Sequence, residues 1–436
     1  MDSLAHYLYD WGIIPYGISC LAYTFNILNF NPIMKENLLR KCEDYLKTLC
    51  VDIIERCVGS EGNRQATYFL EKVFSQNDWE TEMVEFDAID WEQDGATLRS
   101  VSDSFDVLVS PYSTGFRGEG VLVPASTIEE LSSIDAEDKI ILLHGEIARE
   151  QLMPKNFVFY NPDEHRRIIS ILENSGARAI ICSTGRNSAL AGGVYPFPLI
   201  EDGDFDIPSV YMTEEEGLKL LPLAGKVLSL KSESRRIPGK GYNVIGRRGS
   251  NSSPKIVVTA HIDAKKGTPG AIDNATGVIV LMILAELLRD YNGEHLLEFV
   301  AFNGEDYYAV PGQMIYVSAN ENNFSRIQLN INIDGAGFRE GQSAFSLFDL
   351  PEGMLQHARD VISRYSGIEE GVLWPQGDHS IFLQYDVPAI AVSSKWFIDN
   401  MDSQDITHTP KDNPEIVDCR KIVEVSMALN DLIRSL

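Results

Sequence analysis

Polar residues that could carry out chemistry follow three apolar runs in the second half of the chain. They are one histidine and four carboxylates: His261, Asp263, Glu305, Asp306 and Asp334. Open α/β sheets bind their ligands at the carboxyl ends of the strands, so we expect these side chains to converge. Carboxylates brought together repel one another unless cations neutralise them, and histidine among carboxylates favours zinc. The pattern therefore predicts either a divalent metal site or a cluster held by hydrogen bonds alone.

The apolar runs themselves predict buried strands that alternate with helices. The predicted strands cover residues 255–261, 296–302, 328–334 and 388–394. The predicted helices cover residues 273–289, 351–365 and 414–436. Nearly continuous apolar strands that alternate with helices are typical of a sheet covered on both faces. We therefore predict the α/β class, with an open, doubly wound mixed sheet flanked by helices and a smaller inserted β-rich or α+β domain.

The first half of the chain shows a different pattern of apolar and loop-forming residues. Its amphipathic pattern predicts one helix over residues 35–58, followed by a second helix at 64–75 and a strand at 80–86. Between 96 and 238, short β-like runs alternate with loops rich in Pro, Gly and Ser, and 234–241 is predicted to be the linker that leads back. The predicted domains are a leader, a split main domain and an insert, at residues 1–34, 35–95 with 239–436, and 96–238.

The N-terminal leader bears on localisation. Residues 11–34 contain no charged side chain, and a stretch of that length can span a bilayer. Pro15 and Pro32 interrupt it, and the first ten residues lack the basic start of a secretory signal. We therefore predict a buried leader and a cytoplasmic protein, with membrane anchoring or export through this stretch as the alternative.

The cysteines favour a reducing compartment. There are six of them, with no CxxC pair and no Cys/His cluster. Cys42, Cys50 and Cys57 fall in one predicted helix at spacings of seven and eight. Neighbours in this series lie roughly 10–12 Å apart along a helix, beyond the reach of a disulfide. They are interpreted as buried thiols.

Composition and charge exclude several classes of protein. Hydrophobic residues make up 44% and charged residues 23%, which excludes a disordered, collagen-like or polytopic membrane chain. The 37 Lys and Arg against 64 Asp and Glu leave a net charge of −27. A surface this acidic repels phosphate backbones, so no nucleic-acid partner is predicted.

Several ordered motifs resemble one known family. The main ones are residues 259–263 (TAHID), 268–277 (TPGAIDNATG) and 299–306 (FVAFNGED). Further matches lie at 332–334, 377–379 and 407–412. Together they resemble the zinc aminopeptidases of metallopeptidase family twenty-eight, whose relatives include glutamate carboxypeptidases, glutaminyl cyclases and the inert transferrin receptor. The predicted insert is similar, less specifically, to a protease-associated domain.

The resemblance implies a role for each site residue. Asp273 would bridge two divalent metal ions, most simply Zn²⁺. The other ligands would be His261 and Asp334 for one ion, and Asp306 and His408 for the second. Glu305 would be the general base, and Asp263 would orient His261. The implied activity is hydrolysis of N-terminal residues from peptide substrates.

One residue departs from the family pattern. Asp306 stands where the family usually has Glu, and the missing methylene withdraws the carboxylate by about 1.5 Å. Metal–oxygen distances tolerate only about ±0.2 Å. We therefore expect either that the loop advances or that this ion is held more weakly.

Three other functions remain open on the sequence. A carboxypeptidase would need a cation for the free carboxylate of its substrate, and Arg339 is the candidate nearby. A glutaminyl cyclase is compatible with His261 and His408, whereas an inert receptor would lack ligands that this chain retains.

His379 is interpreted as a structural or substrate-pocket histidine, because the ligand positions are already filled. A GxSxG elbow and a GxxxxGK[ST] loop are both absent from the sequence, which disfavours a serine hydrolase and an ATPase.

Overall fold

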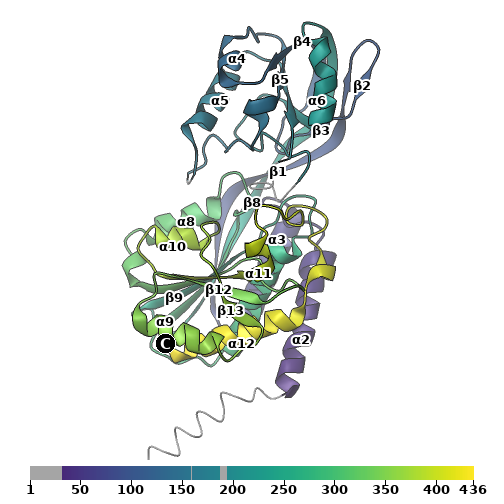
Figure 1. Cartoon of the computed structure of the whole chain (residues 1–436). Helices are drawn as coiled ribbons and strands as arrows, with labels where there is room; N and C mark the ends of the chain where they lie inside the picture. The colour runs from purple at the N-terminus through teal and green to yellow at the C-terminus, as the bar shows by residue number, and fades with distance from the viewer. Residues whose placement is uncertain (1–31, 159, 187–193) are drawn as a thin grey trace, which may run out of the picture.

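The computed structural model describes residues 32–158, 160–186 and 194–436. Figure 1 shows a larger lower part and a smaller upper part, joined by two long strands. These strands are β1 (Glu80–Arg99) and β8 (Val227–Arg248). We call residues 100–226, between the two strands, the upper part, and residues 32–79 with 249–436 the lower part.

The lower part is built on a mixed sheet. Its strands are β9 (Lys255–His261), β10 (Leu296–Phe302), β11 (Ile327–Ile333), β12 (Ser343–Phe348), β13 (Ile368–Glu370) and β14 (Ala389–Ser394). Their order is β13-β12-β14-β11-β9-β10, and β10 then pairs with β8. The four central strands β14, β11, β9 and β10 run parallel, so their carboxyl ends lie at one edge. This arrangement confirms the predicted α/β class and mixed sheet.

Helices cover both faces of this sheet. Those on one face are α2 (Pro32–Lys47), α3 (Glu61–Gln76), α7 (Thr276–Leu287), α9 (Glu352–Ile362) and α12 (Cys419–Ser435). The opposite face is covered by α8 (Pro311–Asn320) and α10 (His379–Leu383), and the short α11 (Lys395–Asp399) follows β14. Alternate residues of one strand take part in the two cores: Ile256 and Val258 pack toward α7, and Val257 packs toward α8.

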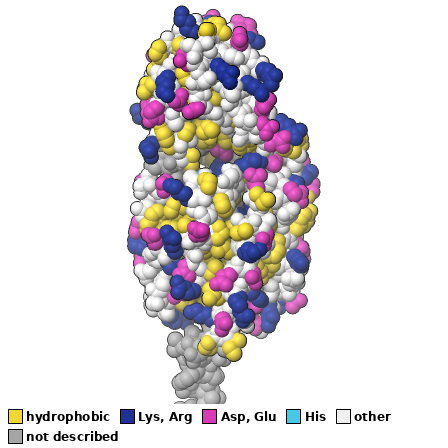
Figure 2. Space-filling model, turned by 90° about the vertical axis from the view of Figure 1, so that its right-hand side faces the viewer, with side chains coloured by type: hydrophobic (Ala, Val, Ile, Leu, Met, Phe, Trp, Pro, Cys, Tyr) yellow, Lys and Arg dark blue, Asp and Glu magenta, His cyan; other side chains and the backbone are white. Residues whose placement is uncertain are grey.

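The upper part has its own layered core. Its strands are β2 (Ser104–Phe105), β3 (Leu108–Val109), β4 (Phe116–Ala125), β5 (Ile140–Leu143), β6 (Ala179–Thr184) and β7 (Ser209–Thr213). Its helices are α4 (Ile128–Ser133), α5 (Asp163–Glu173) and α6 (Glu214–Leu220). Strands β4 to β7 are parallel, and alternate residues of β5 pack on α5 and on α6. Hydrophobic side chains gather at the waist between the two parts, where Figure 2 shows the surface hollowed.

The two parts are connected by strands and not by a linker. The segment 234–241, predicted to be a linker, lies inside β8 and pairs with β1. Pro238 has no backbone N–H to donate and lies opposite Ile89 of β1. The backbone N–H and C=O of Ile89 bond instead to the Tyr307 hydroxyl, at 2.7 and 3.2 Å, so the proline leaves neither group of Ile89 without a partner. The boundaries predicted at 96 and 238 fall inside these two strands.

The helix predicted over residues 35–58 is wrong at its C-terminal end. α2 ends at Lys47, a π turn follows at Thr48–Asp52, and Ile53 is extended. The apolar spacing continues past this point, but the buried Arg56 needs acceptors that a continuous helix would not offer. Beyond the helix, the Arg56 guanidinium donates to the carbonyl groups of Ile262, Pro269 and Gly270.

Among the described residues, no helix is long and apolar enough to cross a membrane. The uncharged stretch 11–34 lies outside the described residues except for its last three positions, which begin α2. The compartment therefore stays a prediction.

The core of the lower part can be tested at α7, which is buried on every side. Leu281→Ala removes a fully buried side chain, so we expect the free energy of unfolding to fall by about 2–5 kcal/mol. Urea unfolding followed by circular dichroism measures the change. Leu373→Ala is the matched control, because Leu373 is 62% exposed and its loss should cost less than about 0.5 kcal/mol. An equal loss of unfolding free energy in the two variants would show that Leu281 does not lie in a packed core.

Candidate active site

The residues singled out by the sequence lie together at one edge of the lower sheet. His261 is the last residue of β9, and Asp334 directly follows β11. Glu305 and Asp306 lie in the loop after β10. Because β9, β10 and β11 are parallel neighbours, these ends meet at one place. The predicted convergence is confirmed.

Two further residues complete the cluster from irregular segments. Asp273 lies in a π turn at Ala271–Ala275 with non-helical backbone angles, and His408 lies in a loop with a φ of +62°. The Asp273 carboxylate lies between the two histidines, with Oδ1 3.1 Å from His261 Nε2 and Oδ2 3.2 Å from His408 Nε2. Its two oxygens thus face opposite halves of the cluster.

Each half has a second carboxylate. His261 Nε2 lies 3.6 Å from Asp334 Oδ1, and His408 Nε2 lies 3.0 Å from Asp306 Oδ1. We call the first half the Asp334 half and the second the Asp306 half. In each half, one atom from each of the three residues lies within 4.8 Å of the others, a spacing that can hold a metal ion.

The buried polar atoms of the cluster fit a divalent cation. Both ring nitrogens of His261 and Oδ2 of Asp306 are buried without a hydrogen-bond partner. A buried polar atom without a partner is costly, and such atoms call for an explanation such as an ion. Imidazole and carboxylate ligands in these numbers suit zinc. The donor set of the cluster therefore matches the metal that the sequence predicts.

Opposite charges in the cluster shift the pKa values of its members. Burial lowers the pKa of His261, but the carboxylates of Asp263, Asp273 and Asp334 outweigh it and raise that pKa well above its usual value. Burial raises the pKa of Asp273, but the two histidines lower it below its usual range. The Asp273 carboxylate is therefore strongly stabilised by positive charge, which either imidazolium or a metal ion supplies.

Glu305 has a different environment. Burial raises its pKa well above the usual value; His261 opposes this shift, and the carboxylates of Asp306, Asp334 and Asp378 add to it. Glu305 lines two of the cavities that open onto the cluster. A carboxyl group with a raised pKa, placed between two cavities, is suited to take up and release a proton.

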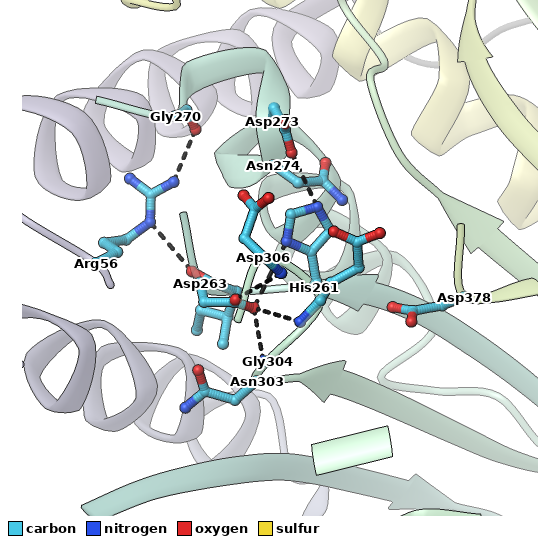
Figure 3. Close-up of polar contacts among 12 residues, drawn as sticks. Arg56, His261, Asp263, Gly270, Asp273, Asn274, Asn303, Gly304, Asp306 and Asp378 are labelled. Atoms are coloured by element: carbon cyan, nitrogen blue, oxygen red, sulfur yellow. Dashed lines mark hydrogen bonds and ion pairs between the residues drawn. The ribbon is translucent and has the colours of Figure 1, made fainter. Parts of the chain in front are cut away.

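Asp263 fixes the loop that carries Glu305 and Asp306. Its carboxylate accepts backbone N–H bonds from Gly304, Glu305 and Asp306, at 2.8, 3.2 and 3.0 Å (Figure 3). Its distance to His261 Nδ1 is 3.6 Å, beyond a hydrogen bond. The hydrogen bonds of Asp263 go to the loop, and the orientation of His261 by Asp263 stays a prediction.

Two residues that support the cluster were missed by the sequence reasoning. The Arg56 guanidinium donates to the carbonyl groups of Ile262 and Gly270, and also to those of Leu49 and Pro269. Asp412 accepts backbone N–H bonds from Ile272 and Asp273 at 2.7 and 3.0 Å. Together they hold the segment that carries Asp273. Asp412 ends one of the recognised motifs, whereas no local pattern marks Arg56.

His379 is a structural residue. It is fully buried, donates to the Trp374 carbonyl at 3.0 Å, and packs against the rings of Phe348 and Trp374. Burial lowers its pKa to about 4. Its neighbour Asp378 lines a cavity beside Glu305 instead, and burial raises the pKa of that carboxyl to about 7.

Three cavities meet at the cluster, and His408 lines all of them. The Phe397 cavity, of about 300 Å³, is lined by the apolar side chains of Trp374, Phe397 and Met401 and by two carboxylates of the Asp334 half, Asp273 and Asp334. The other two lie where the upper part meets the lower part. We call them the Trp91 cavity (about 240 Å³) and the Tyr308 cavity (about 610 Å³), after residues that line them.

The comparisons with known proteins cover the part of the chain that carries this cluster. Residues 243–433 match the model of peptidase family M28. Over these residues, which make up less than half of the chain, the sequence is similar to peptidase family M28. The resemblance inferred from the motifs is thereby confirmed, and the M28 match contains all five predicted metal ligands and Glu305.

Individual relatives are aminopeptidases by name. Aminopeptidase YwaD of Bacillus subtilis is 30% identical over 169 residues, which cover 38% of this chain and 35% of that protein. A probable leucine aminopeptidase 2 of Aspergillus oryzae is 25% identical over 201 residues, covering 45% and 34%. The chain thus spans about a third of the length of these curated relatives.

Solved structures share the fold over most of both chains. The aminopeptidase from Aneurinibacillus sp. strain AM-1 has a TM-score of 0.69 at 20% identity, covering 92% of this chain and 93% of that one. A zinc aminopeptidase from Bacillus subtilis has a TM-score of 0.68 at 17% identity, covering 91% and 94%. The M28 fold is therefore accompanied by a similar overall arrangement beyond residues 243–433.

The support that Arg56 gives to the site can be tested. Arg56→Met leaves several buried carbonyl groups without a donor, so we expect the free energy of unfolding to fall by at least about 2 kcal/mol. The segment that holds Asp273 should loosen, which calorimetric zinc titration would detect as weaker binding. Arg40→Met is the control, because Arg40 is exposed and, among the described residues, its side chain bonds to Asn37 alone. Should both variants behave like the wild type, Arg56 has no supporting role.

Proposed function

We propose that the chain is a metal-dependent aminopeptidase that uses two divalent ions, most simply zinc. The observation that carries this proposal is the position of the Asp273 carboxylate between His261 and His408. His261, Asp273 and Asp334 would hold one ion, and Asp273, Asp306 and His408 the other. When bound, the ions would supply Lewis-acid activation of water and of the scissile carbonyl group.

The side chains around the cluster support the remaining steps. Glu305 accepts a proton from the attacking water and passes it to the departing amine, for which its raised pKa suits it. Asp263 keeps Glu305 in place through the backbone of the loop. The apolar wall of the Phe397 cavity, formed by Trp374, Phe397 and Met401, fits a hydrophobic side chain of the N-terminal residue of a peptide.

The charges around the cluster favour an aminopeptidase over a carboxypeptidase. A free α-ammonium group can donate hydrogen bonds to carboxyl oxygen atoms, and those of Asp378 and Glu305 line the Tyr308 cavity. A carboxypeptidase needs a free cation, and Arg339, the predicted candidate, lines a surface groove beside α2 instead. Of the described residues, the cations that line the three cavities are Lys265 and Lys266, and both are ion-paired.

We further propose that the predicted insert, 96–238, limits access to short peptides. Gln151 and Glu201 of the upper part line both the Trp91 cavity and the Tyr308 cavity, together with Asp306 and His408. A long or folded substrate would have to displace this wall. The resemblance of the insert to a protease-associated domain remains a prediction.

Metal removal combined with a substrate panel tests the proposed activity. A chelator should abolish hydrolysis of leucyl-4-nitroanilide, and zinc or cobalt should restore it, because Asp273 and its neighbours would bind the activating ions. N-acetyl-leucyl-4-nitroanilide is the matched substrate and should not be cleaved, because it lacks the α-ammonium group. Cleavage of N-blocked peptides from the C-terminus, or full activity in a preparation shown by elemental analysis to be metal-free, would refute the proposal.

Adjacent substitutions separate proton transfer from metal binding. Glu305→Gln should keep both ions and lower kcat by about 10²–10⁴-fold, with little change in substrate affinity. Asp306→Ala should lower metal occupancy, and part of the activity should return at high metal concentration. The Asp306 carboxylate already lies 3.0 Å from His408, so Asp306→Glu should crowd the site and loosen the ion. Metal titration followed by activity distinguishes the variants; loss of metal in Glu305→Gln alone would reverse the two roles.

A further inference from the structure

An ion pair joins the upper part of the molecule to the lower part beside the cluster. Lys265 Nζ donates to Glu201 Oε1 at 2.8 Å, and Gln151 Nε2 donates to Glu201 Oε2 at 2.9 Å. The side chains of Lys265 and Glu201 are only 25% and 11% exposed. The shared carboxylate lies outside residues 243–433, whereas Lys265 lies four residues after His261 in the M28 match.

This pair adjoins the Asp306 half of the cluster. Lys265 and Glu201 line the Trp91 cavity and the Tyr308 cavity, each time together with Asp306 and His408. Burial lowers the pKa of Lys265, but the charges of Glu201, Asp306 and Glu305 outweigh it and raise that pKa above the usual value. The ammonium group of Lys265 is therefore charged, and it interacts electrostatically with the carboxylates of Asp306 and Glu305.

The Asp334 half is placed differently. The Phe397 cavity, which Asp334 lines, contains no Lys or Arg among its lining residues. Any electrostatic effect of Lys265 should therefore be larger on the Asp306 half than on the Asp334 half. The Asp306 half is also the one whose ligand is shorter by one methylene than the family pattern.

A partly buried ammonium group next to a metal site opposes binding of a divalent cation. In the partly desolvated interior of a protein, like charges interact far more strongly than in water. A carboxylate in direct contact with the ammonium cancels most of this repulsion. Glu201 occupies that position, and the segment around it is held in turn: Leu152 N–H donates to the Leu199 carbonyl at 2.9 Å, and Asp202 accepts the Lys155 N–H at 2.8 Å.

We propose that Glu201 neutralises Lys265 and thereby sets the affinity of the Asp306 half for its divalent ion. The proposal rests on the proposed function, because it presupposes that the cluster binds metal. Glu201 is a positioning and charge-compensating residue that does not itself coordinate the ion. The upper part thus completes the electrostatics of a site whose ligands all belong to the lower part.

Metal titration of charge variants tests this directly. In calorimetric titration of the full-length, metal-free chain with zinc, Glu201→Gln keeps the shape of the side chain and leaves Lys265 uncompensated. One of two binding events should then weaken by at least about tenfold, and the other should change less. Lys265→Met should tighten the same event, because Glu201 then adds negative charge. The double variant should bind nearly like the wild type.

The control removes the same charge elsewhere in the upper part. Asp206→Asn also deletes one carboxylate, and Asp206 pairs with Arg236 at 2.7 Å away from the three cavities. It should leave both zinc affinities unchanged. Circular dichroism establishes that each variant is folded; if Glu201→Gln is not folded, Lys265→Met decides, and unchanged zinc affinity in that variant overturns the proposal.

The results separate this inference from the function on which it rests. A wild type that binds zinc twice, together with a folded Glu201→Gln variant of unchanged affinity, overturns the role of Glu201 and leaves the aminopeptidase intact. A wild type that binds no zinc refutes the metal-dependent function itself. Equal weakening in Glu201→Gln and Asp206→Asn would show an effect of net charge alone, which also overturns the role of Glu201.

Discussion

The lower part of the molecule is organised by one electrostatic constraint, the crowding of carboxylates at the carboxyl ends of parallel strands. Among the described residues, Asp273, Glu305, Asp306 and Asp334 share this place with two histidines, His261 and His408. Each carboxylate must find positive charge or hydrogen-bond donors, because burial without them is costly. Asp273 lies between the two imidazoles, and Asp263 instead accepts three backbone N–H groups. The irregular segments that carry these groups follow from that need.

Those segments are held by residues far from them in the sequence. Asn303 exchanges two side-chain hydrogen bonds with Asn63 of α3, and its backbone N–H donates to Asn243 of β8. Arg56, ahead of α3, holds the segment that leads to Asp273. The N-terminal helices therefore belong to the support of the site, although residues 243–433 contain all its proposed metal ligands. The similarity of fold to solved aminopeptidase structures also extends over about nine-tenths of the chain.

The sequence predicted what depends on local pattern. Strands such as 255–261 were predicted at their observed bounds because a strand buried on both faces is a continuous apolar run. Asp273 and His408 came only from the family resemblance, because their backbone is irregular and no period places them. The end of α2 and the role of Arg56 could not be predicted, because both depend on carbonyl groups more than two hundred residues away. The linker predicted at 234–241 was wrong for a similar reason, since its strand partner lies in β1.

The continuity of β1 and β8 has a consequence for the site. A flexible linker would let the upper part move independently, whereas two long strands paired over almost their whole length fix its position. Side chains of the upper part can then take part in the electrostatics of the cluster at hydrogen-bond distances, as Glu201 does through Lys265. An active site whose ligands all come from one part of a chain can therefore still depend on another part for its charge balance. The short side chain of Asp306 and the partly buried ammonium group of Lys265 lie where we expect that dependence to be strongest.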